Sequence, residues 1–244
     1  MSELDRDSAR RPAELDPVSP PDPQDRDAVL GWLAARWAAL PAHPVVRVAV
    51  DGVDGAGKTT LADELARRVQ ALGRPVIRVS VDGFHQPRAA RYARGRTSPE
   101  GFYRDSYDLA ALEREVLAPL SPGGHKRYRA QVFDVTRDEP VTAPAQEATP
   151  GSVLIVDGLF LHRPELRGWW HDSVFLRVPF GVSVPRGAAR GPGFGSPDPA
   201  ADSNHRYVEG NRLYFREATP EAQAGVVLDY ADLLAPRVVA ARER

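Results

Sequence analysis

The sequence of 244 residues contains no cysteine and only one methionine. Without cysteine there can be no disulfide, no thiolate zinc site and no cysteine nucleophile. The chain also lacks an apolar run close to the roughly 20 residues that a membrane-spanning helix needs. Its charged first residues are not followed by the apolar segment of a secretion signal. These absences lead us to expect a cytoplasmic protein without a membrane partner.

Neither positive nor negative charge is in excess, because the formal net charge is only −1. A protein that binds the backbone of a nucleic acid needs a basic surface, so we expect no nucleic acid partner. Lysine is scarce too: of 32 basic residues, only Lys58 and Lys126 are lysines. A lysine in this chain therefore indicates a place that needs a compact ammonium group, which a planar guanidinium cannot imitate.

Lys58 belongs to a glycine-rich loop, residues 52–59, which follows the apolar run 45–50 and precedes a helical pattern. The loop fits the phosphate-binding pattern G-x-x-x-x-G-K-[ST]. Its glycines would let backbone N–H groups converge on phosphate oxygens, and the following helix adds its positive N-terminal end. Lys58 would reach the terminal phosphates, and the Thr59 hydroxyl would bind Mg²⁺. The predicted ATP-binding residues are Gly52, Asp54, Gly55, Ala56, Gly57, Lys58, Thr59 and Thr60.

The elements around this loop predict a parallel sheet. Residues 1–24 hold five prolines among charged residues, which is typical of a disordered tail, so the folded domain is expected over residues 25–244. A strand at 45–50, a helix at 58–72 and a strand at 75–81 follow one another, and a crossover helix implies parallel strands. The most apolar strand, at 153–156, is typical of a buried central strand.

Weaker patterns predict the remaining elements. Residues 85–104, rich in arginine, glycine and proline, are expected to form a functional loop. The other expectations are helices near 25–40, 108–120 and 207–216, strands at 173–180 and 226–228, a small hairpin from 128–133 and 139–141, and a glycine- and proline-broken loop at 181–199.

Asp157, directly after the strand at 153–156, is the natural partner of Thr59. A carboxylate at this place in a phosphate-loop protein holds Mg²⁺ directly or through water; the alternative is that it caps a neighbouring turn. The next residue is Gly158, not the water-activating glutamate of motor-type ATPases, and no Asn-Lys-x-Asp guanine signal is present. Both features favour phosphate transfer to a bound molecule over hydrolysis.

Asp82 stands at the end of the second strand. Ligands of parallel sheets bind outside the carboxyl ends of the strands, so Asp82 and the phosphate loop should open into one crevice. A substrate hydroxyl that attacks a phosphate needs a proton acceptor nearby, which makes Asp82 the candidate general base. The alternative is that it caps the turn at Gly83.

Together these motifs resemble the uridine kinase branch of the P-loop kinases, which also includes pantothenate kinase and phosphoribulokinase. The resemblance rests on the phosphate loop, on Asp82-Gly83-Phe84-His85 and on Val156-Asp157-Gly158-Leu159, and it extends over about residues 45–239. It implies a P-loop NTPase three-layer α/β/α sandwich with a mostly parallel sheet and a lid at about 181–205. It also implies that Asp82 is the catalytic acid/base residue, that Asp157 assists Mg²⁺ and that Asp108 holds ribose hydroxyls.

Two segments depart from the family pattern. The segment 133–138 has no histidine where uridine kinases read the pyrimidine, and the lid keeps Arg190 but loses its acidic residue and helical continuity. The predicted catalytic residues are Asp82, Lys58 and Arg190, and the predicted substrate contacts are Phe84, His85, Asp108 and Arg137. Five histidines lack metal-ligand spacing and are expected at the surface or in packing: His43, His125, His162, His171 and His205.

The sequence therefore predicts an ATP- and Mg²⁺-dependent kinase for a small-molecule phosphate acceptor. A pyrimidine nucleoside such as uridine or cytidine is the first acceptor expected. Another alcohol, such as pantothenate or a sugar, is the alternative within the enzyme class. From a different class, an ATP-binding regulatory protein with weak transfer activity stays open, as does assembly into a homo-oligomer.

Overall fold

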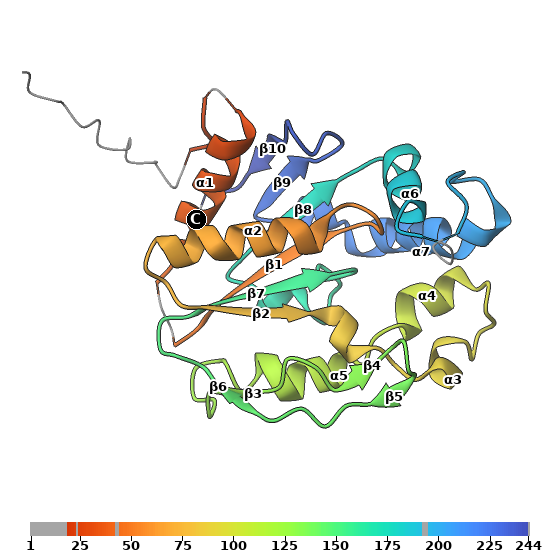
Figure 1. Ribbon diagram of the computed structural model, residues 1–244, viewed down its shortest axis with the longest axis horizontal. Helices are drawn as coiled ribbons and strands as arrows, with labels where there is room; N and C mark the ends of the chain where they lie inside the picture. Colours follow the sequence, from red (N-terminus) through yellow and green to blue (C-terminus); the bar gives the residue numbers. More distant parts are fainter. Residues whose placement is uncertain (1–18, 23, 42–43, 192–194, 244) are drawn as a thin grey trace, which may run out of the picture.

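A six-stranded sheet forms the centre of the computed structural model, which describes residues 19–22, 24–41, 44–191 and 195–243 (Figure 1). Most of the predicted tail at 1–24 therefore lies outside the described residues, as does His43. The strand order is β10-β9-β8-β1-β7-β2, and within this sheet β10 alone runs antiparallel to its neighbour. The strands are β1 (Val46–Gly52), β2 (Val76–Ser80), β7 (Val153–Gly158), β8 (Asp172–Arg177), β9 (Val226–Asp229) and β10 (Arg237–Ala241).

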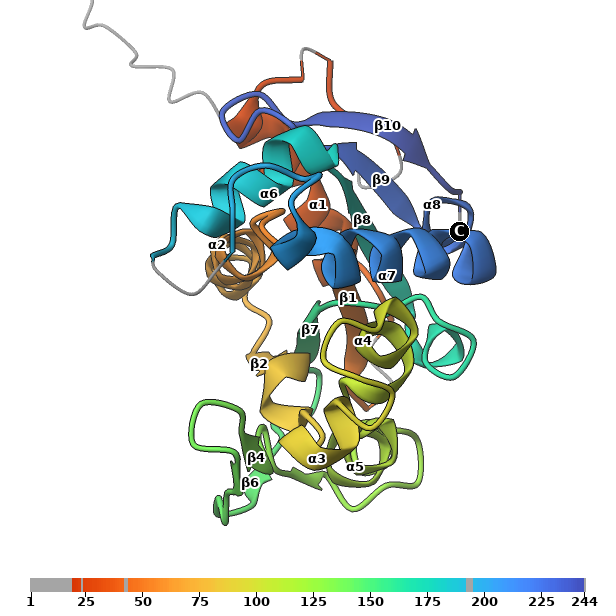
Figure 2. The ribbon, with the colours of Figure 1, turned by 90° about the vertical axis from the view of Figure 1, so that its right-hand side faces the viewer.

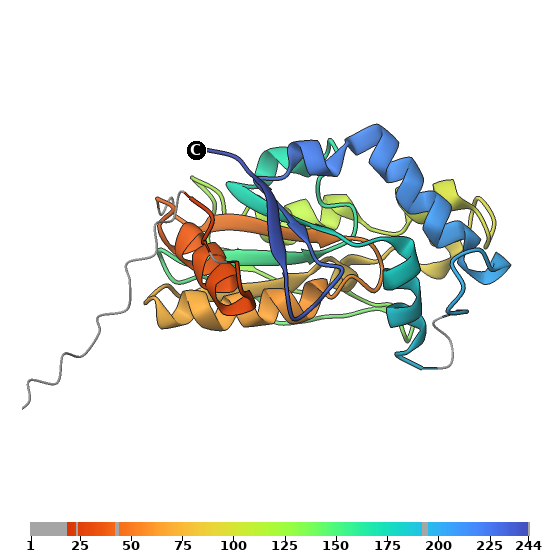
Figure 3. The same ribbon diagram turned by 90° about the horizontal axis from the view of Figure 1, so that it is seen from above.

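Helices cover both faces of this sheet, as Figures 1 and 3 show. Every residue of β1 and β7 is buried, which explains why these strands are almost continuously apolar. Because side chains alternate between the faces of a strand, Val48 packs toward α1 (Arg26–Ala38) and α2 (Lys58–Ala71), while Ala49 packs toward the opposite face. The predicted three-layer arrangement is confirmed.

The opposite face carries most of the remaining helices. They include the short turns η1 (Val81–Phe84), α3 (Arg88–Arg91), α5 (Leu109–Leu112), η2 (Glu113–Leu117), η3 (Arg167–Trp169) and α8 (Pro220–Gln223), and the longer α4 (Pro99–Asp105) and α7 (Asp202–Ala218). Helix α6 (Phe180–Ala188) lies with α7 and α4 near the carboxyl ends of the parallel strands (Figure 2). None of the helices in the described ranges is both long and apolar enough to span a membrane.

Several sequence expectations were wrong in detail. The expected loop at 85–104 contains α3 and α4, the expected helix at 108–120 breaks into α5 and the π-helical turn η2, and β10 was not foreseen. The expected hairpin is present but short, as the antiparallel pair β4 (Phe133–Asp134) with β5 (Glu139–Pro140), whereas Tyr128 lies in a separate pair, β3 (Arg127–Tyr128) with β6 (Gln146–Glu147).

The largest difference is α6, which is helical where glycine and proline predicted a broken loop. Pro185 lies inside this helix and has no N–H to donate, but its carbonyl still accepts from the Ala189 N–H at 3.0 Å in the last turn. Tertiary packing outweighs the weak helix propensity: the Phe180 ring stacks on Phe215 of α7 with 6.2 Å between ring centres, and Ser183 is fully buried.

Candidate active site

The phosphate loop connects β1 to α2, and its backbone requires glycine at two positions. Gly55 and Gly57 have φ values of +71° and +94°, which side chains other than glycine rarely adopt. No side chain caps the N-terminus of α2. The first N–H groups of this helix are therefore free to meet phosphate oxygens, and the helix end adds positive potential.

Lys58 and Asp54 share the interior of the loop. The Lys58 ammonium donates a hydrogen bond of 2.8 Å to the Val53 carbonyl, and the Asp54 carboxylate accepts one of 3.1 Å from the Asn211 amide on α7. Burial lowers the pKa of Lys58, and burial raises the pKa of Asp54. In both cases the side chain is removed from water, which disfavours its charged form. An incoming phosphate would therefore give the ammonium a strong partner.

The predicted magnesium ligands meet at the rim of the loop. The Thr59 hydroxyl donates a hydrogen bond of 2.6 Å to Oδ2 of Asp157, and the Arg78 guanidinium lies 2.9 Å from Oδ1 of the same carboxylate. In the described part of the chain, no group of three or more histidines or carboxylates is arranged to hold a metal. Two oxygen groups beside a phosphate site nevertheless fit Mg²⁺, which commonly takes one or two protein ligands and completes its shell with phosphates and water.

Asp82 lies in η1, just beyond β2, and opens into the same cavity. Its Oδ1 accepts a hydrogen bond of 3.1 Å from the Tyr107 hydroxyl, while Oδ2 accepts none from the described residues. The imidazole of His85 packs on the Tyr107 ring at 4.6 Å, and its Nδ1 lies 2.8 Å from the Asp82 carbonyl oxygen. A carbonyl only accepts, so Nδ1 carries the proton. Burial lowers the pKa of His85, which keeps the ring neutral and leaves Nε2 as an acceptor.

One cavity of about 570 Å³ joins these groups, with the phosphate loop on one side and Asp82 and His85 on the other. Helix α6 lies over the loop: a Cβ atom added to Gly55 would fall 2.1 Å from the Ser183 carbonyl oxygen. The exposed Arg190 follows α6, lines the cavity and makes no ion pair with the described residues. The structure thus brings the three predicted catalytic residues, both predicted magnesium ligands and His85 to one cavity.

Three predicted substrate contacts lie elsewhere. Phe84 is fully buried in the core, and the Asp108 carboxylate caps α5 by accepting a 2.9 Å bond from the Ala111 N–H. Arg137 is 73% exposed and faces Asp134 and Glu139. None of the three lines the cavity.

Sequence reasoning missed the opposite wall of the cavity, which α3, α4 and α7 supply. Its cavity-lining residues are Arg91, Tyr92, Phe102, Ser106, Tyr107, Asn204, Arg206 and Tyr207. The richness of residues 85–104 in arginine, glycine and proline was the one available signal, and it identified the segment but not the side chains. Asn204 and Arg206 lay outside the helix that was expected to begin at residue 207, whereas α7 begins at Asp202.

A buried polar network lies behind the phosphate loop. Oδ1 of Asp51 accepts from the Gly52 N–H at 2.7 Å, and Oδ2 accepts from the His162 Nδ1 at 2.7 Å and the Tyr214 hydroxyl at 2.5 Å. His162 Nε2 in turn accepts from the Ser173 hydroxyl at 2.8 Å. His162 is therefore an interior residue with a full set of partners. Burial raises the pKa of Tyr214 well above its usual range, so its hydroxyl stays a donor.

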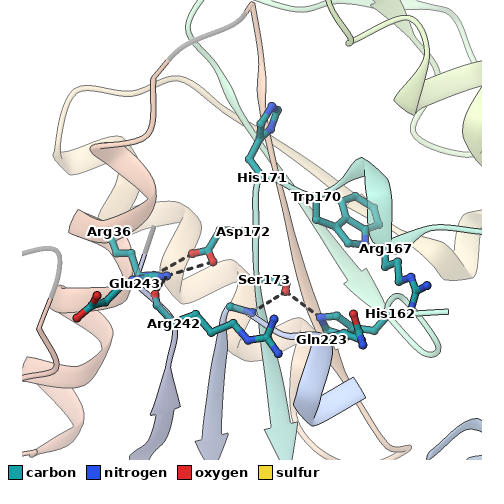
Figure 4. A pocket seen from close by; sticks show the side chains of 11 residues that line it. Arg36, His162, Arg167, Trp170, His171, Asp172, Ser173, Gln223, Arg242 and Glu243 are labelled. Atoms are coloured by element: carbon teal, nitrogen blue, oxygen red, sulfur yellow. Dashed lines mark hydrogen bonds and ion pairs between the residues drawn. The ribbon is translucent and has the colours of Figure 1, made fainter. Parts of the chain in front are cut away.

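His162 and Ser173 also form the floor of a second cavity, of about 190 Å³ (Figure 4). Arg36 and Asp172 form an ion pair of 3.1 Å at its other side. Asp51, His162 and Ser173 are connected in the order of a catalytic triad, but Ser173 is buried and its hydroxyl also accepts from the Gly225 N–H at 3.2 Å. The network therefore fixes the position of Asp51 at the start of the phosphate loop.

Solved structures with the same fold include several kinases. A possible uridine kinase from Bacillus stearothermophilus matches with a TM-score of 0.65 and 21% identity, over 81% of this chain and 96% of its own. A candidate fructose transport system kinase from Silicibacter sp. TM1040 matches with a TM-score of 0.62 and 27% identity, over 78% and 96%. Phosphoribulokinase from Rhodobacter spheroides matches with a TM-score of 0.52 and 16% identity, over 77% and 71%.

By sequence, neither a known protein family nor a curated protein matches the chain. The similarity in structure therefore extends further than the similarity in sequence. It confirms the predicted α/β fold.

Proposed function

We propose that the chain is a cytoplasmic kinase which transfers the γ-phosphate of ATP to a hydroxyl group of a small molecule. It has the fold that its sequence predicted, and solved structures with this fold include a possible uridine kinase and a phosphoribulokinase. The observation that carries this proposal is the shared cavity. A phosphate loop with Lys58 stands on one side of it, and a carboxylate with a free oxygen, Asp82, stands on the other.

In the proposed reaction the acceptor oxygen attacks the γ-phosphorus. The bond between that phosphorus and the oxygen bridging to the β-phosphate breaks, ADP leaves, and the acceptor's proton passes to Oδ2 of Asp82. Tyr107 holds the other carboxylate oxygen and so fixes the direction in which Asp82 accepts. Lys58, Arg190 and the N-terminus of α2 neutralise the charge on the transferred group.

Thr59 and Asp157 would hold Mg²⁺ at the loop, where it supplies positive charge to the β- and γ-phosphates. The Arg78 guanidinium beside Asp157 leaves Oδ2 facing Thr59, so one carboxylate oxygen remains for the metal or its water. Helix α6 lies over the loop, where it would shield the phosphate from hydrolysis.

Two sets of observations bear on the identity of the acceptor, and each favours a different class of molecule. The sequence resemblance and the possible uridine kinase of the same fold favour a pyrimidine nucleoside. The positions of Asp108 and Arg137, which lie away from the cavity lining, favour another alcohol such as pantothenate or a sugar.

The test is acceptor-dependent ADP release, measured over uridine, cytidine, pantothenate and simple sugars. Asp82→Asn keeps the shape of the side chain and should leave ATP binding nearly intact, while transfer falls at least about 100-fold because the proton acceptor is gone. Asp232→Asn is the matched control, since Asp232 is exposed and bonds only to the backbone N–H of Leu234.

Near wild-type transfer by Asp82→Asn would show that the base is another group. ATP binding without ADP release for any acceptor would instead favour the regulatory, ATP-binding alternative.

A further inference from the structure

Arg206 is a buried cation in the wall of the cavity that the phosphate loop also lines. It lies in the second turn of α7 and is 8% exposed. Its guanidinium carbon lies 4.9 Å from the centre of the Tyr92 ring and 5.5 Å from the centres of the Phe102 and Tyr207 rings. Nη1 donates a hydrogen bond of 2.8 Å to the Arg96 carbonyl, whereas Nε is buried without a partner.

This arrangement leaves a charge only partly compensated. A guanidinium has five N–H donors, and a buried charge is costly unless it is paired. Aromatic faces offset part of that cost. Within the described ranges no carboxylate forms an ion pair with Arg206, while Arg91, on the same wall, is already paired with Asp138 at 3.0 Å.

In the described structure no carboxylate that lines the cavity pairs with Arg206. Asp54 accepts from Asn211, and Asp82 accepts from Tyr107 through Oδ1, while its Oδ2 is left for the acceptor's proton. Asp157 accepts from Thr59 and Arg78. The acceptor side of the cavity therefore holds a guanidinium whose remaining donors need an acceptor from outside the protein.

We propose that the phosphate acceptor of this kinase is an alcohol that also carries an anionic group, a carboxylate or a phosphate, and that Arg206 binds that group. The inference rests on the proposed kinase function and narrows its acceptor. A planar, two-oxygen anion matches the donor fork of arginine. A neutral pyrimidine is disfavoured, because the guanidinium lies over the Tyr92, Phe102 and Tyr207 rings and competes there with a stacking base.

The first test compares acceptors in matched pairs that differ only in the anion. Glycerate is compared with glycerol, pantothenate with pantothenol, and ribose 5-phosphate with ribose, with uridine as a neutral nucleoside. ADP release should depend on at least one anionic member and be at least about tenfold weaker with its neutral partner. The carboxylate pairs and the phosphate pair separate the two sources of the anion.

Two variants test whether Arg206 itself binds the anionic group of the acceptor. Arg206→Gln should raise KM for the active anionic acceptor roughly 10- to 100-fold, with KM for ATP unchanged and with little effect on any neutral acceptor. Arg96→Gln is the matched control: its guanidinium also lies over Tyr92, at 5.3 Å, but it is exposed and does not line the cavity. A purely structural role for Arg206 would lower turnover of neutral and anionic acceptors alike.

A binding measurement on the wild-type protein does not require turnover. With Mg²⁺ and a non-hydrolysable ATP analogue filling the phosphate loop, the ¹⁵N–¹H resonance of the Arg206 Nε group is followed by NMR and assigned by its loss in Arg206→Lys. Glycerate or inorganic phosphate should shift this resonance, whereas glycerol and uridine should not.

The outcomes separate the two proposals. Transfer to uridine or to neutral partners only, or an Nε resonance that neither anion shifts, would overturn the anionic acceptor while leaving the kinase in place. A shift with an anion but no ADP release from any acceptor would support the anion site and count against the proposed transfer.

Discussion

Replacing Gly55 by alanine should displace helix α6 from the phosphate loop. A Cβ atom at Gly55 would lie 2.1 Å from the Ser183 carbonyl oxygen and 3.0 Å from the Gly187 nitrogen, both backbone atoms of α6. Side-chain rotation cannot relieve such contacts, so either the loop or the helix must move. Gly73, just after α2, is the matched control: its φ of +84° is similar to the +71° of Gly55, but a Cβ there would meet nothing within 4 Å.

Both glycines have a positive φ, but a Cβ atom would meet backbone atoms of α6 only at Gly55. Alanine in the left-handed region costs roughly 1–2 kcal/mol, of which about 0.4–1 kcal/mol is returned because the unfolded chain becomes stiffer. Gly73→Ala should therefore lower the free energy of unfolding by about 1 kcal/mol. Gly55→Ala bears the same cost together with overpacking, which typically adds about 1–3 kcal/mol.

Urea denaturation and ATP titration measure the two ways in which this cost can appear. If α6 keeps its place, Gly55→Ala unfolds at lower urea than Gly73→Ala. If α6 lifts away, the stabilities converge and the affinity for ATP falls in Gly55→Ala alone. Equal stability and equal ATP affinity in the two variants would refute the position of α6 over the loop.

Two further predictions concern protons and metal. Burial lowers the pKa of His85 in the folded chain. Between that lowered pKa and the ordinary pKa of about 6.5, the unfolded chain binds more protons than the folded chain, so the free energy of unfolding should fall as the pH drops through this window. His85→Gln should flatten that part of the pH dependence of the urea midpoint, and an unchanged slope would contradict the assignment. Asp157→Asn should raise the Mg²⁺ concentration for half-maximal turnover about 10-fold or more, with ATP binding in the absence of metal unchanged. An unaltered Mg²⁺ titration would show that Asp157 is not a metal ligand.

The donor side of the site could be predicted because it depends on local sequence. The phosphate loop needs glycine at fixed spacings, and the structure gives Gly55 and Gly57 positive φ values there. Asp82 and Asp157 were placed beside it by the rule that ligands gather at the carboxyl ends of parallel strands, and both line its cavity. Secondary structure was predictable for the same reason wherever apolar periodicity was strong, as in β1, α2 and β7.

The acceptor side could not be predicted, because long-range packing sets it. Arg206 meets Tyr92 and Phe102 only when α7 packs on α4, more than 100 positions away in sequence. Nothing local to residue 206 distinguishes it from the many other arginines of this chain. The role of Asp108 as a ribose ligand came from the family resemblance, whereas in the fold its carboxylate accepts from the Ala111 N–H and caps α5.

Helix α7 has one more consequence, for the way the molecule opens. It bonds to Asp51, just before the phosphate loop, through Tyr214 and to Asp54 within the loop through Asn211, and its first two turns carry Arg206 and other residues that line the cavity. Segments joined in this way open together, so amide hydrogens of α7 and of residues 51–58 should exchange with solvent as one cooperative unit. ATP alone would then slow exchange at the far end of α7, beyond the reach of its phosphates.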